Sequence, residues 1–290
     1  MGNPYFLFYL VYFLRLAMIP DKPFKLGTTS FIFPDHIIPN VKKLGPFFDE
    51  IELLIFESQP AFVLPSKDNV KELLYLSLQH DLTYNIHLPT DLSLTCDSLA
   101  ERQKARDILL KVIDLFEPVI PTTHTLHLEM PQDVKKDLGN QSKLEKWIKN
   151  ICHGLEDLLK DIVNPGIISI ETLDYPFSLI DTLVDEFNLS VCIDAGHQIK
   201  YNYDLVQTFE KHKSRTSIIH LHGVDFLGHK IKDHTALDKL PEKYLCQVKM
   251  ILERFTGVVS LEVFNLENLN GSLSFLSKVF NNIAPHINKK

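Results

Sequence analysis

The stretch LSVCIDAGH, residues 189–197, is a short apolar run that ends in a carboxylate and an imidazole, Asp194 and His197. The same arrangement recurs in IHLP at His87, LHLE at His127, ISIET at Glu171, IIHLHG at His220 and His222, and SLEVF at Glu262. Polar groups at the ends of several consecutive strands are typical of the active site of a parallel barrel. The recurrence therefore predicts both a fold and the place of a functional site.

Short β-branched runs alternate with longer amphipathic ones from Lys25 onward. Helical periodicity appears, for instance, in SLAERQKARDILLKVIDLF and KLEKWIKNICHGLEDLLKDI. Strands are expected near residues 25–33, 51–57, 83–88, 123–129, 166–172, 189–194, 216–222 and 257–264. Eight strands alternating with helices imply an α/β protein, a closed parallel (β/α)8 TIM barrel rather than an open sheet. Residues 25–290 are predicted to form this one catalytic domain.

The first residues form a separate segment, because Tyr5 to Ile19 is almost entirely aromatic and aliphatic. A membrane-spanning helix needs about 20 apolar residues, whereas this run is shorter and is interrupted by Arg15. The flanking basic and small residues of a signal peptide are missing. We expect residues 1–24 to be a dispensable apolar extension with no stable membrane span, or the start codon to be assigned too early, with Met18 as the true start. A membrane-surface or partner anchor is the alternative.

Composition limits the partners and the compartment. The 290 residues carry a net charge of −7, from 37 Asp and Glu against 30 Lys and Arg, so the overall basic field that favours nucleic-acid binding is missing. The four cysteines stand far apart without a CxxC pair, which disfavours a disulfide framework or a structural zinc site. We expect a cytoplasmic protein with no nucleic-acid partner, whose oligomeric state the sequence does not predict.

Side-chain alternation predicts that the polar groups share one face of the wall, since residues i and i+2 of a strand point the same way. Asp194 shares its face with Cys192 and Ser190, while Val191 and Ile193 take the other. The strands that carry His87, His127, Glu171 and Glu262 give the same division. Small or polar residues should therefore point into the barrel and apolar ones outward to the helices.

Imidazoles and carboxylates in one cavity suit zinc, manganese or iron. The candidate metal ligands are His87, His127, Glu171, Asp194, His197, His220, His234 and Glu262, with His222 as a neighbouring polar group. These are too many for one tetrahedral ion, so two or three divalent ions, zinc or manganese, are expected, with a carboxylate such as Glu171 bridging. Adjacent metals serve hydrolysis at phosphorus, and they also serve sugar isomerisation.

Other polar residues are candidates for contact with a substrate. The segment KDHTALDKLP, residues 232–241, should be a loop that brings Asp233 and His234 over the metal pocket. Asp174 and Tyr175 follow the fifth strand, where substrate contacts belong, although entry into a helix at Pro176 is the alternative. Glu57 ends LIFES, where it would line the mouth of the site or cap a helix.

The order HLP, LHLE, ET, CIDAGH, HLHG, DH and LEVF resembles the barrel superfamily of xylose isomerases and endonuclease IV-type enzymes. The resemblance implies that His87 and His127 bind a first metal, bridged by Glu171 to a second. Asp194, His220 and Glu262 would complete the second site, and His197 and His234 would belong to a third. The endonuclease IV pattern has an aspartate two residues before the loop histidine, where this chain has Lys232. A complete third site is therefore in doubt.

A closer resemblance extends from Leu26 to about Leu276. The runs GTTSFIFPDHIIPNV, IELLIFES, LTYNIHLPTDL, ETLDYPFSLID, LSVCIDAGH, IIHLHGV and DHTALDKLP are similar to the cobamide-remodelling phosphodiesterase family, CbiR. The resemblance implies a small-molecule corrinoid substrate, a cobamide of the cobalamin type. Its nucleotide loop would be hydrolysed to a cobinamide derivative for corrinoid salvage and remodelling.

Catalysis would need a group that orients water or takes its proton, and Glu262 and Glu171 are the candidates. Three alternatives stay open for the same fold. The first is an endonuclease IV-like hydrolase of abasic DNA, and the second is a sugar isomerase or epimerase. The third is a barrel that only binds a corrinoid.

Overall fold

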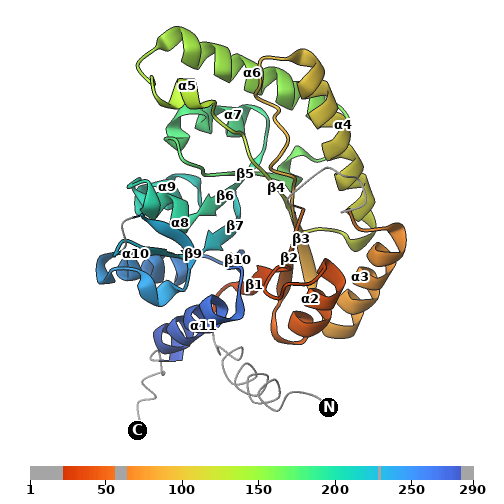
Figure 1. The fold of residues 1–290 in the computed structure, drawn as a ribbon, viewed down its shortest axis with the longest axis vertical. Coiled ribbons are helices and arrows are strands. Elements are labelled where there is room, and N and C mark those ends of the chain that lie inside the picture. The colour runs from red at the N-terminus through yellow and green to blue at the C-terminus, as the bar shows by residue number, and fades with distance from the viewer. Residues whose placement is uncertain (1–21, 56–63, 228–229, 282–290) are drawn as a thin grey trace.

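The computed structural model describes residues 22–55, 64–227 and 230–281. Eight strands close into a barrel in the order β1-β10-β7-β6-β5-β4-β3-β2, and every neighbouring pair is parallel (Figure 1). The strands are β1 (Lys25–Thr29), β2 (Glu50–Leu54), β3 (Thr83–His87), β4 (His124–Leu126), β5 (Ile168–Glu171), β6 (Ser190–Asp194), β7 (Thr216–Leu221) and β10 (Val258–Leu261). The predicted (β/α)8 barrel is confirmed, with shorter strands than expected.

Helices surround the barrel on its outer side (Figure 1). They are α2 (Ile37–Leu44), α3 (Lys67–His80), α4 (Leu99–Phe116), α5 (Gln132–Lys135), α6 (Gln141–Leu159), α7 (Asp181–Glu186), α8 (Ala195–Lys200), α9 (Leu205–His212), α10 (Glu242–Leu252) and α11 (Leu266–Asn281). Several begin at side chains that accept a hydrogen bond from the first turn, such as Ser66 before α3 and Ser98 before α4. None of the described helices is long and apolar enough to cross a membrane.

The core lies between the outer face of the sheet and the helices. Ile170, Val191 and Ile219 point outward into it and are at most 1% exposed. The inner face carries polar side chains. Two of them, Thr123 and Ser169, form a hydrogen bond of 2.5 Å between their hydroxyls. The division predicted from alternation, with polar side chains inside the barrel and apolar ones outside, is therefore confirmed for these residues. The polar side chains inside the barrel form hydrogen bonds with one another.

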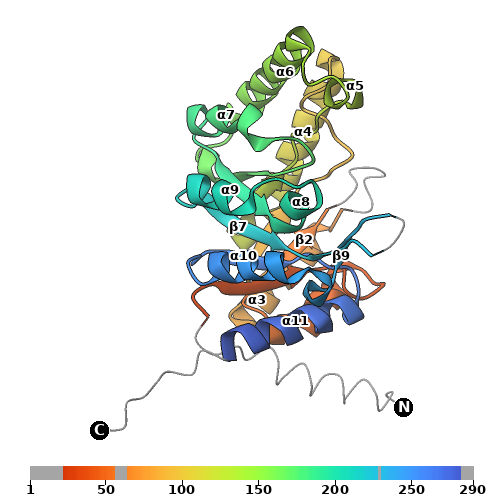
Figure 2. The same cartoon turned by 90° about the vertical axis from the view of Figure 1, so that its left-hand side faces the viewer.

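The segment after β7 folds into an antiparallel hairpin of β8 (Gly223–Asp225) and β9 (Lys232–Thr235). The sequence predicted a loop here, and the loop prediction is wrong for Asp233 and His234, which lie in β9. Any side chain at position 223 would collide with the chain, since its Cβ would lie 1.9 Å from the carbonyl oxygen of Ala236. The hairpin stands out from the body of the barrel (Figure 2).

The N-terminal boundary of the domain stays a prediction. Residues 1–21 fall outside the described residues. Phe24 is 4% exposed and its ring meets that of Phe280 edge-on at 5.5 Å between centroids. Phe24 therefore packs as part of the barrel domain, one residue before its predicted start.

Candidate metal centre

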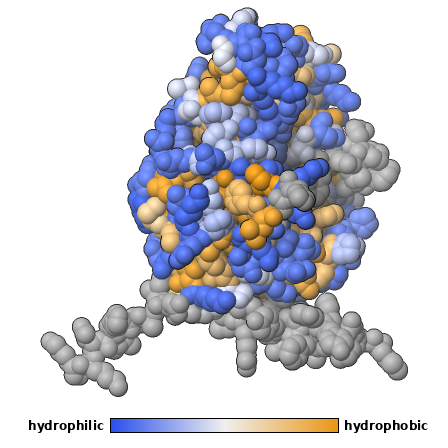
Figure 3. All heavy atoms as spheres, turned by 60° about the vertical axis from the view of Figure 1, so that its left-hand side comes forward, coloured by the Kyte–Doolittle hydropathy of each residue, from blue (hydrophilic) through white to orange (hydrophobic). Residues whose placement is uncertain are grey.

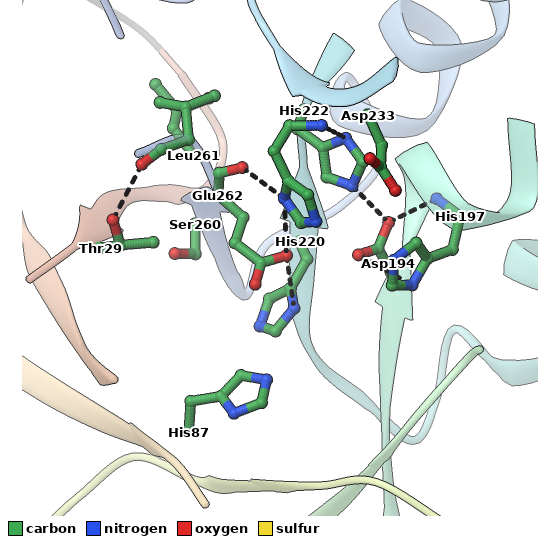
Figure 4. A network of polar contacts seen from close by, with 12 residues as sticks. Thr29, His87, Asp194, His197, His220, His222, Asp233, Ser260, Leu261 and Glu262 are labelled. Atoms are coloured by element: carbon green, nitrogen blue, oxygen red, sulfur yellow. Dashed lines mark hydrogen bonds and ion pairs between the residues drawn. The ribbon is translucent and has the colours of Figure 1, made fainter. Parts of the chain in front are cut away.

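One end of the barrel collects the predicted ligands, because parallel strands end on the same side. Figure 4 shows His87, Asp194, His220 and Glu262 converging from different strands. The strands that carry or directly precede them are β3 for His87, β4 for His127, β5 for Glu171, β6 for Asp194, β7 for His220 and β10 for Glu262. The structure thus brings together residues from 87 to 262 that the sequence had only placed at strand ends.

A first group of possible ligands contains His87, His127 and Glu171. Nε2 of His127 lies 2.9 Å and Nε2 of His87 lies 3.3 Å from the same Glu171 oxygen, Oε2. Nδ1 of His87 faces the carbonyl oxygen of Leu88 at 3.0 Å. An N–H directed at that carbonyl leaves Nε2 with a lone pair aimed at the group.

A second group contains Glu171, Asp194, His220 and Glu262, all buried. Nδ1 of His220 lies 3.5 Å from Oε2 of Glu171 and 3.4 Å from Oε2 of Glu262. Glu171 belongs to both groups and contacts imidazoles on each side. Its carboxylate could therefore contribute to both groups, and its role as a bridge stays a prediction.

A third group consists of His197, His222 and His234. The rings of His222 and His234 stack with centroids 4.1 Å apart, and His197 lies edge-on to both. The backbone N–H of His234 donates to Nδ1 of His222 at 3.0 Å. His234 has φ of 49°, in the left-handed region that costs energy for a side chain with Cβ. His222, predicted as a substrate contact, therefore lies among the possible metal ligands.

Asp233 does not join the third group. Its carboxylate forms an ion pair with Nζ of Lys200 at 2.5 Å. Lys232 lies opposite Asp225 in the register of the hairpin. The aspartate that an endonuclease IV-type site would place here has no equivalent in β9. His222, from the end of β7, instead completes a group of three imidazoles.

The turn after β6 places two ligands at once. Asp194 ends the strand and begins α8, where its Oδ1 accepts from the backbone N–H of His197 at 2.7 Å. This cap fixes His197, whose Nδ1 lies 3.2 Å from Oδ2 of Asp194. Gly196 lies between them because the ring of His222 packs against it, so that a Cβ would lie 2.0 Å from Cε1 of His222.

Opposite charges compensate one another across the site. Burial alone would raise the pKa of Glu171, but His127 and His220 hold it well below its usual value. The pKa of Asp194 is lowered in the same way, against its burial, by His197 and His222. Burial alone would lower the pKa of His127 and of His197. Nearby carboxylates outweigh burial and raise both pKa values to about 10; the largest contribution comes from Glu171 for His127 and from Asp194 for His197.

Metal binding is therefore expected to release protons, since imidazoles charged near neutral pH must become neutral to ligate an ion. His127 and His197, with pKa values of about 10, are the main sources. Affinity should rise as pH increases toward this value. Isothermal titration of the metal-free protein with Zn²⁺ in buffers of different ionisation enthalpy measures the release. A binding enthalpy that does not change with the buffer would contradict it.

The donor set fits divalent cations. Four buried atoms, Oδ2 of Asp194, Oε2 of Glu262, Nδ1 of His220 and Nε2 of His222, have no hydrogen-bond partner among the described residues. Buried polar atoms rarely stay unpaired, and mixed imidazole and carboxylate donors suit zinc or manganese.

Asp174 and Tyr175, which follow β5, form polar contacts with residues that are not candidate ligands. Tyr175 is 1% exposed, packs edge-on against Trp147, and donates its hydroxyl proton to the carbonyl oxygen of Leu128 at 2.8 Å. Asp174 pairs with Lys135 at 2.6 Å. Their contact with a substrate stays a prediction, as does that of Glu57, which lies outside the described residues.

Two carboxylates at the site were missed. Glu52 is 0% exposed and reaches Nε2 of His220 at 2.8 Å, and Glu129 reaches Nδ1 of His127 at 3.3 Å. Alternation in EIELL and in LHLE carried the signal, since Glu50 and Glu52 point one way and His127 and Glu129 are two apart.

The fold matches that of known proteins. A family profile described as the xylose isomerase-like TIM barrel matches residues 38–279. A solved D-tagatose 3-epimerase-like protein is 18% identical with a TM-score of 0.69, and the match covers 90% of this chain and 100% of that one.

Two further solved structures share the fold. The E. coli 3-keto-D-glucoside 4-epimerase YcjR is 12% identical over 89% of this chain and 99% of that one, with a TM-score of 0.63. The probable 3-DHS dehydratase AsbF, involved in petrobactin synthesis, from Bacillus anthracis is 17% identical over 90% and 100%, with a TM-score of 0.64. No curated protein matches the chain. The profile match over most of its length shows that the chain belongs to the xylose isomerase-like TIM barrel family.

Proposed function

We propose that this protein is a metal-dependent phosphodiesterase that hydrolyses the nucleotide loop of a cobamide. The observation that carries the reaction class is the overlap of the sets of possible ligands: the described residues hold five such sets, and three of them share Glu171. Hydrolysis of a phosphodiester uses neighbouring ions well, because one can ionise a water while another stabilises the leaving oxygen. A single-ion reaction would need only the group of Glu171, Asp194, His220 and Glu262.

The side chains have separable tasks in this reaction. Glu171 would contribute to two ion sites, and Glu262, which faces the same nitrogen of His220 as Glu171 does, would orient a water or take its proton. His197 and His234 approach from α8 and β9, where they would contact the phosphate or bind a third ion. Bound ions would supply charge neutralisation for the phosphodiester anion.

The substrate class follows from the resemblance to CbiR, and the structure gives its diagnostic motifs a use. In GTTSF, the hydroxyls of Thr28 and Thr29 donate to the carbonyl oxygens of Leu261 and Val263 at 3.1 and 3.0 Å. These bonds hold the chain on both sides of Glu262. In ETLDYPF, Oγ1 of Thr172 accepts from the backbone N–H of Asp194 at 2.9 Å. The motifs thus position ligands, which supports a shared chemistry.

Exposed apolar side chains lie on the hairpin that carries His234, and such side chains would favour a large, partly apolar substrate. Leu227 and Ile231, at the two sides of the hairpin that carries His234, are 97% and 48% exposed. Figure 3 shows apolar patches among polar surface on one face of the molecule. A net charge of −7 disfavours DNA as the substrate, and four free cysteines accord with a cytoplasmic enzyme.

Product analysis tests the proposal. The metal-free protein would be supplied with Zn²⁺ or Mn²⁺ and incubated with an adenosylated cobamide, and the products identified by mass spectrometry. We expect a cobinamide species and the matching riboside only when metal is present. An intact cobamide with every metal would refute the substrate, and cleavage of an abasic DNA duplex instead would reassign the phosphodiester.

A sugar epimerase is the second candidate, favoured by one observation. Glu171 and Glu262 both lie in the four-residue group, where two carboxylates beside one ion could move protons on either face of a sugar. Ketohexoses belong in the same assay. Conversion of a ketose with one ion per chain, and no cobamide cleavage, would establish this reaction.

A further inference from the structure

Glu52 lies inside the barrel directly behind a candidate ligand. It projects from β2, is 0% exposed, and its Oε1 lies 2.8 Å from Nε2 of His220, which is also 0% exposed. Its other oxygen, Oε2, accepts a hydrogen bond from Oγ of Ser260 at 2.6 Å. Among the described residues, neither Oε1 nor Nε2 of His220 has a hydrogen-bond partner, so at 2.8 Å each is available to the other. One oxygen of Glu52 is thus held in place and the other is directed at the imidazole.

The two nitrogens of His220 face different surroundings. Nδ1 lies 3.4 Å from Glu262 and 3.5 Å from Glu171, in the group that also contains Asp194. A neutral imidazole has one lone pair and one N–H, and the partner of the second nitrogen decides which is which. A carboxylate against Nε2 favours the proton there and leaves the lone pair of Nδ1 for an ion.

We propose that Glu52 is a positioning residue for the metal centre. It accepts the Nε2 proton of His220, holds the ring so that Nδ1 points at Glu171 and Glu262, and increases the basicity of that nitrogen. Ser260, on the strand that leads to Glu262, fixes the Glu52 carboxylate. The inference rests on the metal centre and not on the identity of the substrate.

A competing geometry is available at the same place. Glu52, His87 and His220 have ligand atoms close enough to hold an ion themselves. In that arrangement Nε2 of His220 would carry the lone pair, and Nδ1 would lose its role toward Glu171 and Glu262. The two assignments predict different ion counts, which makes them distinguishable.

The variants are Glu52→Gln, which keeps the size and one acceptor oxygen, and Glu52→Met, which keeps the size but removes the acceptor. Glu50→Gln is the matched control. Glu50 lies two residues earlier on β2, is equally buried, and binds Thr83, Asn85 and Thr122 with no contact to a ligand. This control measures how much the loss of a buried carboxylate in β2 by itself lowers the stability of the fold.

Metal content, affinity by competition with a chromophoric chelator, and the visible spectrum of the Co²⁺-loaded protein are measured for each variant, with thermal unfolding to establish that it folds. We expect Glu52→Met to bind the ion at His220 about 10–100-fold more weakly, with an altered Co²⁺ spectrum and an unchanged number of sites. Glu52→Gln should fall between it and the wild type. Glu50→Gln should keep the wild-type affinity and spectrum.

An affinity and spectrum of Glu52→Met equal to those of the wild type would overturn the proposal. Loss of one whole ion, with the others bound as tightly as before, would overturn it in favour of Glu52 as a ligand. A wild-type protein that binds no ion would refute the metal centre together with the proposed hydrolysis. If the wild type binds ions but leaves a cobamide intact, only the hydrolysis fails, and the role of Glu52 is still decided by the variants.

Discussion

Replacing Glu171 by glutamine is expected to abolish turnover and to weaken the three sets of possible metal ligands, of five among the described residues, that contain this carboxylate. The carboxylate contacts His87, His127, His197 and His220, and it is 1% exposed. A neutral amide cannot bridge two cations, since it offers one weaker oxygen donor. The loss should therefore exceed the ~10–100-fold that removal of an outer partner of a ligand costs.

Ion counting by mass spectrometry and kcat/KM for the chosen substrate measure this effect. Glu129→Gln is the matched control, because Glu129 touches His127 at 3.3 Å from outside the group and its side chain is 43% exposed. It should keep every ion and lose no more activity than the about 10–100-fold that an outer partner of a ligand contributes. If Glu171→Gln kept two ions and most of its activity, Glu171 would not bridge, and a mechanism based on paired ions would fall with it.

Gly196→Ala should damage the third ligand group although it adds a single methyl group. The added Cβ would lie 2.0, 2.3 and 2.4 Å from three atoms of the His222 ring. His222 has no free space to move into, since it is 0% exposed, stacked on His234, and 3.2 Å from Asp194 through Nε2. The ring must therefore leave its place or α8 must shift away from β7.

Overpacking of this kind costs about 1–3 kcal/mol, which outweighs the gain of about 1 kcal/mol that alanine brings to a helix. We expect a lower unfolding temperature and the loss of any ion held by His197, His222 and His234. The double variant Gly196→Ala with His222→Ala should regain stability but not the ion. Gly139→Ala is the control, because nothing lies within 4 Å of a Cβ there. A Gly196→Ala protein that kept its stability and its ions would show that the ring can move aside.

The barrel was predictable because the two patterns that indicate it, alternation within strands and helical periodicity between them, are local in the sequence. Each strand alternates small or polar residues with β-branched ones, and a run such as ISIET carries that division without reference to the rest of the chain. The predicted strands extended past the residues at which the strands of the structure end. His127 and Glu262 lie just past β4 and β10, where the chain has left the ladder but its side chains still face the site.

The hairpin and the outer partners were harder to predict. Strands β8 and β9 have three and four residues, too few for periodicity to register, and their pairing depends on how close Gly223 lies to Ala236. Glu57 and not Glu52 was predicted at the site, because the expected strand extended to residue 57 whereas β2 ends at Leu54. Contact of Glu52 with His220, 168 positions away, arises only when β2 and β7 face each other across the lumen.

Closure of the barrel links the completion of the site to the order in which the chain is made. Strand β10 lies between β1 and β7, so the first strand synthesised waits for the last one. Until residues 258–262 have left the ribosome, β1 and β7 have exposed edges and Glu262 is missing from the ligand group. A chain in which β3 to β7 had folded without β10 would bring His87, His127 and Glu171 together but would lack Glu262. The proposed activity would therefore require β10 to close the wall between β1 and β7.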